Sequence, residues 1–193
     1  PLCVINGFSE NLREEDGYLT KQHYIDVIQQ QAGDMDALVH KMLNFSKLES
    51  DSAKLNIKSF NIKTELENIA KKYNNISSKN IIVTADDKEI FADKELMELV
   101  FENLIENAVK YSKDNSDIKI SFANNNFNIS NECDEISKKD LKKIWKPYNR
   151  LEKDEEVRGT GIGLSIVKHI LKLHRIKPYT EYSGGRLIIG FYI

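Results

Sequence analysis

The chain has 193 residues, of which 40% are hydrophobic and 30% charged, and its formal net charge is −2. This composition is typical of a folded globular protein and excludes disordered and fibrous classes. The lysine-rich stretch 138–143 is interrupted by an acid, so no basic stripe typical of nucleic-acid binding is present, and no nucleic-acid partner is expected. Cys3 and Cys133 lack metal-ligand spacing and fit a reducing compartment. No apolar run approaches the roughly 20 residues that span a bilayer.

Two helices are predicted at the start of the chain, at residues 1–13 and about 20–49. The second places its apolar side chains at helical spacing. Gly17 and Thr20 mark the turn between them, so the two helices are expected to form an antiparallel hairpin. A hairpin of this size cannot bury both of its faces alone. We therefore expect a second copy to complete a four-helix bundle, the alternative being that the hairpin packs on its own downstream domain.

The rest of the chain mixes strand and helix patterns. The predicted strands are 55–60, 80–84, 89–91, 117–123, 126–130, 177–183 and 186–193. The predicted helices are 61–73, 93–112, 137–145 and 162–174, the first two capped by Asn61 and Asp93. Strands 80–84 and 89–91 are expected to flank a turn at 86–88. Together these elements predict an α+β sandwich in which helices cover one sheet.

The helix predicted at 93–112 carries a row of polar side chains. Asn103, Asn107 and Lys110 fall at i, i+4 and i+7, on one face of the helix. Carboxamide oxygens together with phosphate oxygens are suitable ligands for Mg²⁺, and a lysine can contact a phosphate. The row therefore indicates a site for a metal-bound phosphate. From this helix alone, a solvated polar face without a ligand stays an alternative.

A glycine run, Gly-Thr-Gly-Ile-Gly-Leu at 159–164, leads directly into the apolar helix predicted at 162–174. Glycine permits positive φ and a close approach of the backbone to phosphate, and the helix N-terminus adds free N–H donors. A polar loop precedes the run, so it fits the dinucleotide fingerprint poorly, and no Gly-Lys-Ser/Thr comes after it, so it is not a P-loop. Together with the carboxamide row, the run predicts a site for a metal-bound polyphosphate.

Three segments, in this order and spacing, resemble the sensor histidine kinases of two-component systems. Residues 103–111 (N-L-I-E-N-A-V-K-Y) resemble their N box. Residues 144–150 (I-W-K-P-Y-N-R) are similar to the F box, and 159–168 (G-T-G-I-G-L-S-I-V-K) to the G2 box. The first residues, P-L-C-V-I-N-G, resemble the segment just after the phosphoacceptor histidine in the pattern H-E-x-K-T-P-L. The resemblance covers nearly the whole chain.

The resemblance implies two domains: a dimerisation and phosphotransfer hairpin at 1–50, and a catalytic domain at 51–193. The fold of the second would be the Bergerat-type sandwich that gyrase, heat-shock chaperone and histidine kinase ATPases share. ATP and Mg²⁺ are the implied cofactors, with Asn107 and Asn103 holding the metal and residues 146–160 forming a lid. The implied nucleotide-binding residues are Asn103, Asn107, Lys110, Tyr111, Asn131, Tyr148, Arg150, Arg158, Gly159, Thr160, Gly161, Gly163 and Leu164.

The family's reaction implies the partners. The γ-phosphoryl group would pass to a histidine on the hairpin and then to an aspartate on the receiver domain of a response regulator, and catalysis would rest on positioning and charge neutralisation. The chain would form a homodimer through the hairpin. It would lie on the cytoplasmic side of the membrane, attached only through upstream segments, because a chain that begins at Pro1 is expected to be part of a longer one.

Two departures from the family pattern matter. The motif histidine would lie five residues before Pro1, so this chain is expected to bind ATP without phosphorylating itself. Its four histidines, His23, His40, His169 and His174, do not sit in the motif and are expected to be surface or packing residues.

The second departure is in the G1 box, whose family pattern is D-x-G-x-G-I. Counting back from Trp145 places Asn131 at the aspartate position, with Cys133 and Glu135 in place of two glycines. An asparagine still accepts a hydrogen bond from the adenine amino group but lacks charge assistance. Weaker or altered purine binding is expected. Two alternatives to an active kinase stay open: a degenerate signalling module or phosphatase scaffold, and another ATPase of the same fold.

Overall fold

The computed structural model describes residues 2–14, 17–49, 55–147, 149 and 161–193. The chain divides into two compact units, residues 1–51 and residues 52–193, and each is described by itself. The domain boundary expected between residues 50 and 51 falls outside the described residues and stays a prediction. In the part of the chain that the structure describes, no helix combines the length and apolar content needed to cross a membrane.

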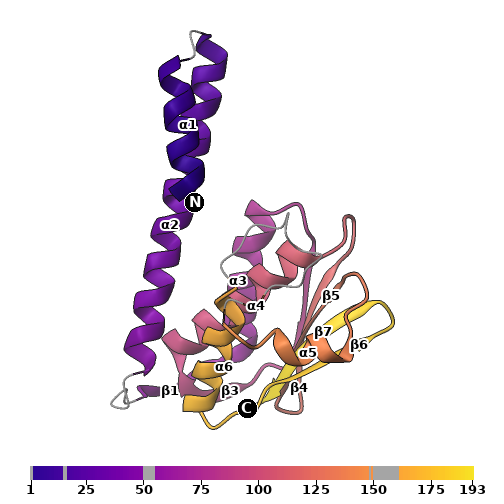
Figure 1. The fold of residues 1–193 in the computed structure, drawn as a ribbon. Helices are drawn as coiled ribbons and strands as arrows, with labels where there is room; N and C mark the ends of the chain where they lie inside the picture. Colours follow the sequence, from indigo (N-terminus) through magenta and orange to yellow (C-terminus); the bar gives the residue numbers. More distant parts are fainter. Residues whose placement is uncertain (1, 15–16, 50–54, 148, 150–160) are drawn as a thin grey trace. The chain divides into compact units, whose positions relative to one another are not determined.

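The first unit is the helical hairpin expected from the sequence. Helix α1 (Leu2–Glu14) runs beside α2 (Tyr18–Glu49) (Figure 1). The ring of Phe8 packs edge-on against that of Tyr24, with centroids 5.4 Å apart, and joins the two helices. Several apolar side chains of the hairpin are exposed, namely Leu2, Val4, Ile25 and Val39.

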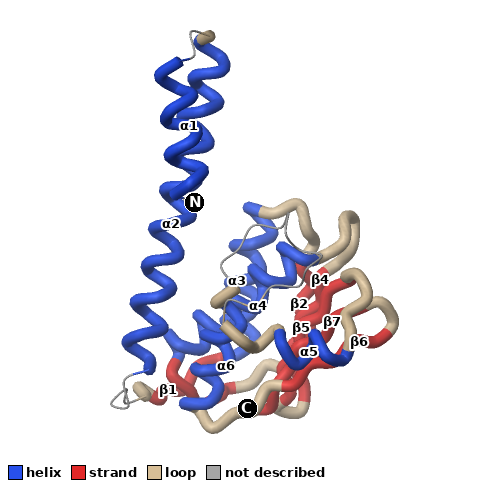
Figure 2. The backbone as a smooth tube through the Cα atoms, viewed as in Figure 1, coloured by secondary structure: helices blue, strands red, loops and turns tan. Residues whose placement is uncertain are grey.

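The second unit combines strands and helices (Figure 2). In chain order, its elements are β1 (Ile57–Asn61), α3 (Ile62–Ile76), β2 (Ile81–Ala85), β3 (Glu89–Asp93), α4 (Lys94–Tyr111), β4 (Ile118–Ala123), β5 (Asn126–Glu132), α5 (Lys138–Lys143), α6 (Gly163–Leu173), β6 (Tyr179–Ser183) and β7 (Arg186–Tyr192). The predicted caps are confirmed: Asn61 Oδ1 accepts from the Thr64 N–H at 2.9 Å, and Asp93 Oδ1 from the Leu96 N–H at 3.2 Å. The α+β fold class is therefore confirmed.

The strands form a five-stranded sheet in the order β2-β4-β5-β7-β6 and a separate ribbon of β1 and β3. Strands β2 and β3 lie on either side of residues 86–88, as predicted, but they do not pair with each other. Strand β2 instead pairs in parallel with β4, and β3 pairs antiparallel with β1. The residues of the expected turn bind other partners, since the Asp86 N–H donates to the Phe122 carbonyl at 2.9 Å and the Lys88 carbonyl accepts from the Ile62 N–H at 3.0 Å.

The core lies between one face of the five-stranded sheet and the helices. Along β5, the residues at positions 127, 129 and 131 are buried while their neighbours are not, as expected for a strand with one covered face. The rings of Phe127 and Phe191 stack with centroids 4.8 Å apart, and Phe101 of α4 lies 5.1 Å from Phe127. This aromatic cluster fixes α4 against β5, and therefore sets where the polar row of α4 lies.

The other face of the sheet has its own close contact. Tyr179 of β6 lies across Gly190 of β7, and a Cβ atom at position 190 would stand 2.5 Å from the Tyr179 hydroxyl. That hydroxyl lies 2.9 Å from Asn126 Oδ1 and also contacts the Asn128 carboxamide oxygen. A side chain at position 190 would force the Tyr179 ring and the Asn128 carboxamide to shift, so glycine suits this position.

Candidate functional site

The carboxamide of Asn103 lies inside the helical layer of the second unit. Only 4% of this residue is exposed. Its Nδ2 atom donates to the carbonyl of Leu99, one turn earlier on α4, at 2.7 Å. Its Oδ1 atom is buried and has no hydrogen-bond partner among the described residues. A buried acceptor without a partner costs free energy, so such an atom indicates a place where a ligand supplies the missing bond.

That oxygen is directed at the start of α6. A Cβ atom built on Gly163, the first residue of α6, would lie 3.0 Å from Asn103 Oδ1. The first-turn N–H groups of a helix have no partner within the helix. Ile162, at the N-cap position, has an aliphatic side chain that cannot accept from them. An oxygen ligand and the N–H groups of a helix start thus lie side by side, as a metal-bound phosphate requires.

The glycine run reaches this helix start through a left-handed residue. Gly161 has a φ of 68°, a conformation that residues with a Cβ rarely adopt. Leu164, in the first turn of α6, is half-buried. The remaining predicted residues of the lid and the run, Tyr148, Arg150, Arg158, Gly159 and Thr160, lie outside the described residues.

The rest of the polar row follows Asn103 along α4. Asn107 lies one turn further on and is half-buried. Lys110 and Tyr111 form the end of the helix and are also half-buried, with Lys110 Nζ 5.6 Å from the centroid of the Tyr111 ring. The row therefore runs from the start of α6 to the carboxyl end of α4; it is buried at Asn103 and partly accessible from Asn107 onward.

Asn131 lies near the far end of that row. It occupies the covered face of β5, where 3% of it is exposed, and its Nδ2 atom makes only a long hydrogen bond of 3.4 Å to the carbonyl of Glu132. The same carbonyl accepts from the N–H of Lys113, two residues beyond α4, at 2.9 Å. The carboxyl ends of α4 and β5 are therefore adjacent, which brings Asn131 to the Tyr111 end of the row.

The residues after Asn131 are fixed by the last hairpin of the sheet. Cys133 is buried, its N–H donates to the Gly185 carbonyl at 3.2 Å, and its carbonyl accepts from the Tyr182 hydroxyl at 3.4 Å. Cys133 is therefore a small buried side chain held beside the last hairpin. Asp134, by contrast, has a side chain that is 79% exposed and pairs with Lys113 at 3.2 Å.

His174, expected to be a surface or packing residue, supports the site from outside the three boxes. His174, just beyond α6, accepts a hydrogen bond at Nε2 from the N–H of Asp93 at 3.1 Å. Because Nε2 accepts, Nδ1 carries the proton and donates to the Ile170 carbonyl at 2.9 Å. The imidazole thus ties the end of α6 to the start of α4. The sequence holds no signal for this contact, because its partners are 81 residues apart.

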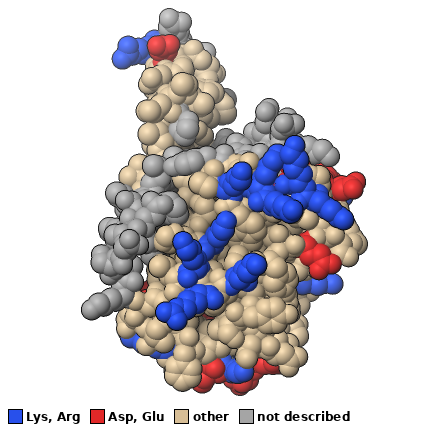
Figure 3. Space-filling view, turned by 60° about the horizontal axis from the view of Figure 1, so that its bottom comes forward, with Lys and Arg blue, Asp and Glu red and all other residues tan. Residues whose placement is uncertain are grey.

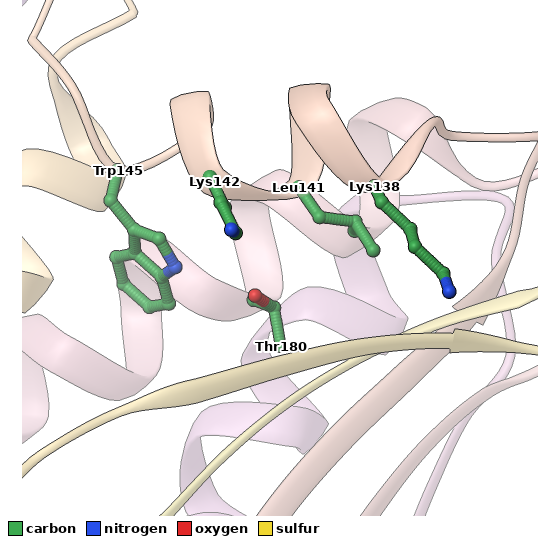
Figure 4. A pocket seen from close by; sticks show the side chains of 5 residues that line it. All are labelled: Lys138, Leu141, Lys142, Trp145 and Thr180. Carbon is green, nitrogen blue, oxygen red and sulfur yellow. The ribbon is translucent and has the colours of Figure 1, made fainter.

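A hollow of about 420 Å³ lies elsewhere, between α5 and β6 (Figure 4). Lys138, Leu141, Lys142, Trp145 and Thr180 line it. Figure 3 shows Lys and Arg side chains gathered in groups on one face, with Asp and Glu mostly at its margins. The hollow contains none of the carboxamides of α4 and no part of the helix start at Gly163, so it is distinct from the candidate phosphate site.

Family models match both units of the chain. Residues 92–189, just over half of the chain, match the model described as histidine kinase-, DNA gyrase B-, and HSP90-like ATPase. Residues 1–51 match the model described as His Kinase A (phospho-acceptor) domain.

Two relatives have similar sequences. The chain is 31% identical over 112 residues to sensor histidine kinase ArsS of Helicobacter pylori, covering 58% of the chain and 24% of ArsS. It is 28% identical over 201 residues to sensor protein kinase WalK of Staphylococcus aureus, covering 96% of the chain and 48% of WalK. The chain thus spans less than half the length of either relative.

Solved structures share the fold. Histidine kinase AdeS of Acinetobacter baumannii aligns with a TM-score of 0.77 at 20% identity, covering all of this chain and 94% of AdeS. Histidine kinase ThkA, solved in complex with response regulator protein TrrA, aligns with a TM-score of 0.77 at 21% identity, covering all of this chain and 57% of ThkA.

Proposed function

Because the chain belongs to the histidine kinase-, DNA gyrase B- and HSP90-like ATPase family, we propose that its second unit binds ATP with Mg²⁺ as the catalytic domain of a sensor histidine kinase. The observation that carries this proposal is the buried, unpartnered Oδ1 of Asn103 beside the start of α6. A divalent ion held by this oxygen would satisfy the orphaned acceptor and would supply positive charge beside the phosphates. The first-turn N–H groups of α6, which have no partner within the helix, would hold the phosphate oxygens.

Each residue of the row has a proposed role that depends on its place. Asn103 and Asn107 supply carboxamide oxygens to Mg²⁺, which neutralises charge on the phosphates when bound. Lys110 adds a positive charge close to the phosphates. Tyr111 and Asn131, at the opposite end, hold the base, with the Asn131 carbonyl oxygen accepting from an exocyclic amino group. The chain's contribution to phosphoryl transfer is therefore positioning and charge neutralisation.

The longer protein would be a two-component sensor kinase on the cytoplasmic side of a membrane. It would transfer the γ-phosphoryl group to a histidine and then to the receiver domain of a response regulator. The complex of ThkA with TrrA supports such a partner. The match of residues 1–51 to the phospho-acceptor domain and the exposed Leu2 and Val39 support a homodimer through the hairpin. Since the motif histidine is absent from these 193 residues, the chain alone is proposed to bind ATP without labelling itself.

The test is a calorimetric titration of ATP, with and without Mg²⁺, into the wild-type chain and two variants. Asn107→Ala removes a proposed metal ligand, whereas Asn75→Ala removes an exposed carboxamide of α3 and serves as the control. We expect the wild-type chain and Asn75→Ala to bind more tightly with Mg²⁺, and Asn107→Ala to lose that gain. Absence of binding at millimolar ATP would contradict the proposal.

A second candidate function is a degenerate domain that signals through its conformation or acts as a phosphatase scaffold. Cys133 and Glu135 replace glycines of the G1 box, and the buried Cys133 is held to the β6–β7 turn at Gly185, which restricts the loop beside the base. An experiment that adds the histidine-bearing residues upstream and supplies labelled ATP discriminates an active kinase domain from a degenerate one. Label on histidine would exclude the degenerate domain, and ATP binding without label would favour it.

A further inference from the structure

Lys79 lies in the turn between α3 and β2, and its ammonium group reaches the segment just beyond α4. Its Nζ atom lies 3.1 Å from the carbonyl oxygen of Ser112, 2.8 Å from that of Lys113 and 3.0 Å from Asp114 Oδ1. The Lys79 side chain is 11% exposed, whereas that of Asp114 is 98% exposed. The exposed ion pair contributes little. The two main-chain carbonyls are therefore the partners that hold this nearly buried ammonium in place.

These carbonyls set the direction in which the chain leaves α4. Helix α4 ends at Tyr111, and Ser112 is extended, with a φ of −74° and a ψ of 137°. No glycine comes directly after the helix, so the left-handed ending that closes many helices is absent here. A cation beside the carboxyl end of a helix also interacts favourably with its dipole. Lys79, which lies in a turn distant in the sequence, thus binds the carbonyls at the carboxyl end of α4, where the local sequence has no glycine to end the helix.

The same segment is bound on its other side by the end of β5. The N–H of Lys113 donates to the Glu132 carbonyl at 2.9 Å while the carbonyl of Lys113 accepts from Lys79. Lys113 comes two residues after Tyr111, and Glu132 comes directly after Asn131. Both residues proposed to hold the base therefore flank the segment that Lys79 fixes.

We propose that Lys79 is a positioning residue for the base end of the nucleotide site. The proposal rests on the proposed function, since it concerns the same site. Lys79 does not touch the nucleotide; it fixes the separation of Tyr111 and Asn131 through the segment between them. The phosphate end, at Asn103 and Gly163, has its own support from the packing of α4 on α6 and does not depend on Lys79.

The test compares Lys79→Met with the control Lys72→Met. Lys72 also pairs with α4, through Glu102 at 2.6 Å, but its side chain is 60% exposed and lies away from the helix end. The probes are ATP and inorganic tripolyphosphate, each with Mg²⁺. Lys79→Met is expected to weaken ATP binding about tenfold, the loss of roughly one charged hydrogen bond, and to leave tripolyphosphate binding unchanged. Lys72→Met should match the wild-type chain for both probes, and Lys79→Arg, which keeps the charge, should recover part of the ATP affinity.

Each other outcome is decisive. Equal ATP affinity in a folded Lys79→Met, or a parallel loss for ATP and tripolyphosphate, would overturn the role of Lys79 while leaving the proposed function standing. No ATP binding by the wild-type chain would remove the proposed function and this role together. If Lys79→Met does not fold, Lys79→Gln takes its place, and unfolding of both variants would overturn the proposal by making Lys79 a stability residue.

Discussion

Asn103 and Gly163 come from helices far apart in the sequence, yet no side chain fits between them. A Cβ atom at position 163 would lie 3.0 Å from Asn103 Oδ1, closer than ordinary van der Waals contact. The buried oxygen therefore lies against the backbone at the start of α6, without an intervening group. This contact joins the two segments that the sequence singled out.

Gly163→Ala is expected to disturb this contact directly. The added methyl displaces the Asn103 carboxamide or the start of α6, so we expect MgATP affinity to fall by roughly tenfold, with a stability loss of about 1 kcal/mol. Gly33→Ala in α2 is the matched control, because no atom lies within 4 Å of its added Cβ. Calorimetric titration and thermal unfolding of both variants measure the two effects. Unchanged MgATP affinity in Gly163→Ala would show that the contact of Asn103 with Gly163 plays no part in nucleotide binding.

Asn131→Asp is expected to strengthen ATP binding, in contrast to Gly163→Ala. A carboxylate accepts from an adenine amino group with charge assistance, so we expect ATP affinity to rise several-fold and discrimination against GTP to increase. The same change buries a charge at a position that is 3% exposed, so the free energy of unfolding without nucleotide should fall by about 1–3 kcal/mol. Competition between ATP and GTP, with denaturant unfolding, tests both parts. If neither the wild-type chain nor Asn131→Asp distinguishes ATP from GTP, Asn131 lies outside the base site.

Gly190→Ala tests the packing on the open face of the sheet. The new methyl would stand 2.5 Å from the Tyr179 hydroxyl, so we expect a loss of about 1–3 kcal/mol in the free energy of unfolding. Combining it with Tyr179→Ala removes the ring from this space and leaves the Asn128 carboxamide as the remaining close neighbour. The double variant should therefore lose less than the sum of the single changes. Urea unfolding of all three variants gives the comparison, and strict additivity would contradict the proposed clash.

The phenol of Tyr73 is expected to make the stability of the fold depend on pH. Burial raises the pKa of its phenol, and the negative charges of Glu106 and Glu102 and a 3.1 Å hydrogen bond to Glu106 raise it further. The phenol therefore stabilises the fold below its ordinary pKa of about 10, and this contribution is lost as pH rises further, because the unfolded chain ionises first. Tyr73→Phe should flatten the decline of stability above that pH. Tyr192→Phe, at an exposed position, is the control and should behave like the wild-type chain.

Features set by neighbouring residues could be predicted from the sequence. The caps at Asn61 and Asp93 are confirmed because each side chain binds an N–H only three residues ahead. The α+β sandwich and the resemblance to sensor histidine kinases are confirmed as well. The three boxes determined that resemblance because each keeps its residue types at fixed spacing within one segment.

Strand partners and supporting contacts could not be predicted in the same way. Strand β2 pairs with β4, and β3 pairs with β1, although β2 and β3 are neighbours in the sequence. The contacts of Lys79 with Lys113 and of His174 with Asp93 join elements that only the folded topology brings together. Their residue types carry no local signal, since lysine and histidine occur at many exposed positions.

The central claim is that the carboxamides of α4 and the start of α6 bind one metal-bound triphosphate. The most direct test replaces Mg²⁺ with paramagnetic Mn²⁺ in the presence of ATP and monitors broadening of assigned amide signals by NMR. We predict that the side-chain amides of Asn103 and Asn107 broaden together with the backbone amides of Gly161 and Gly163. Broadening of one set without the other, at saturating ATP, would contradict the claim.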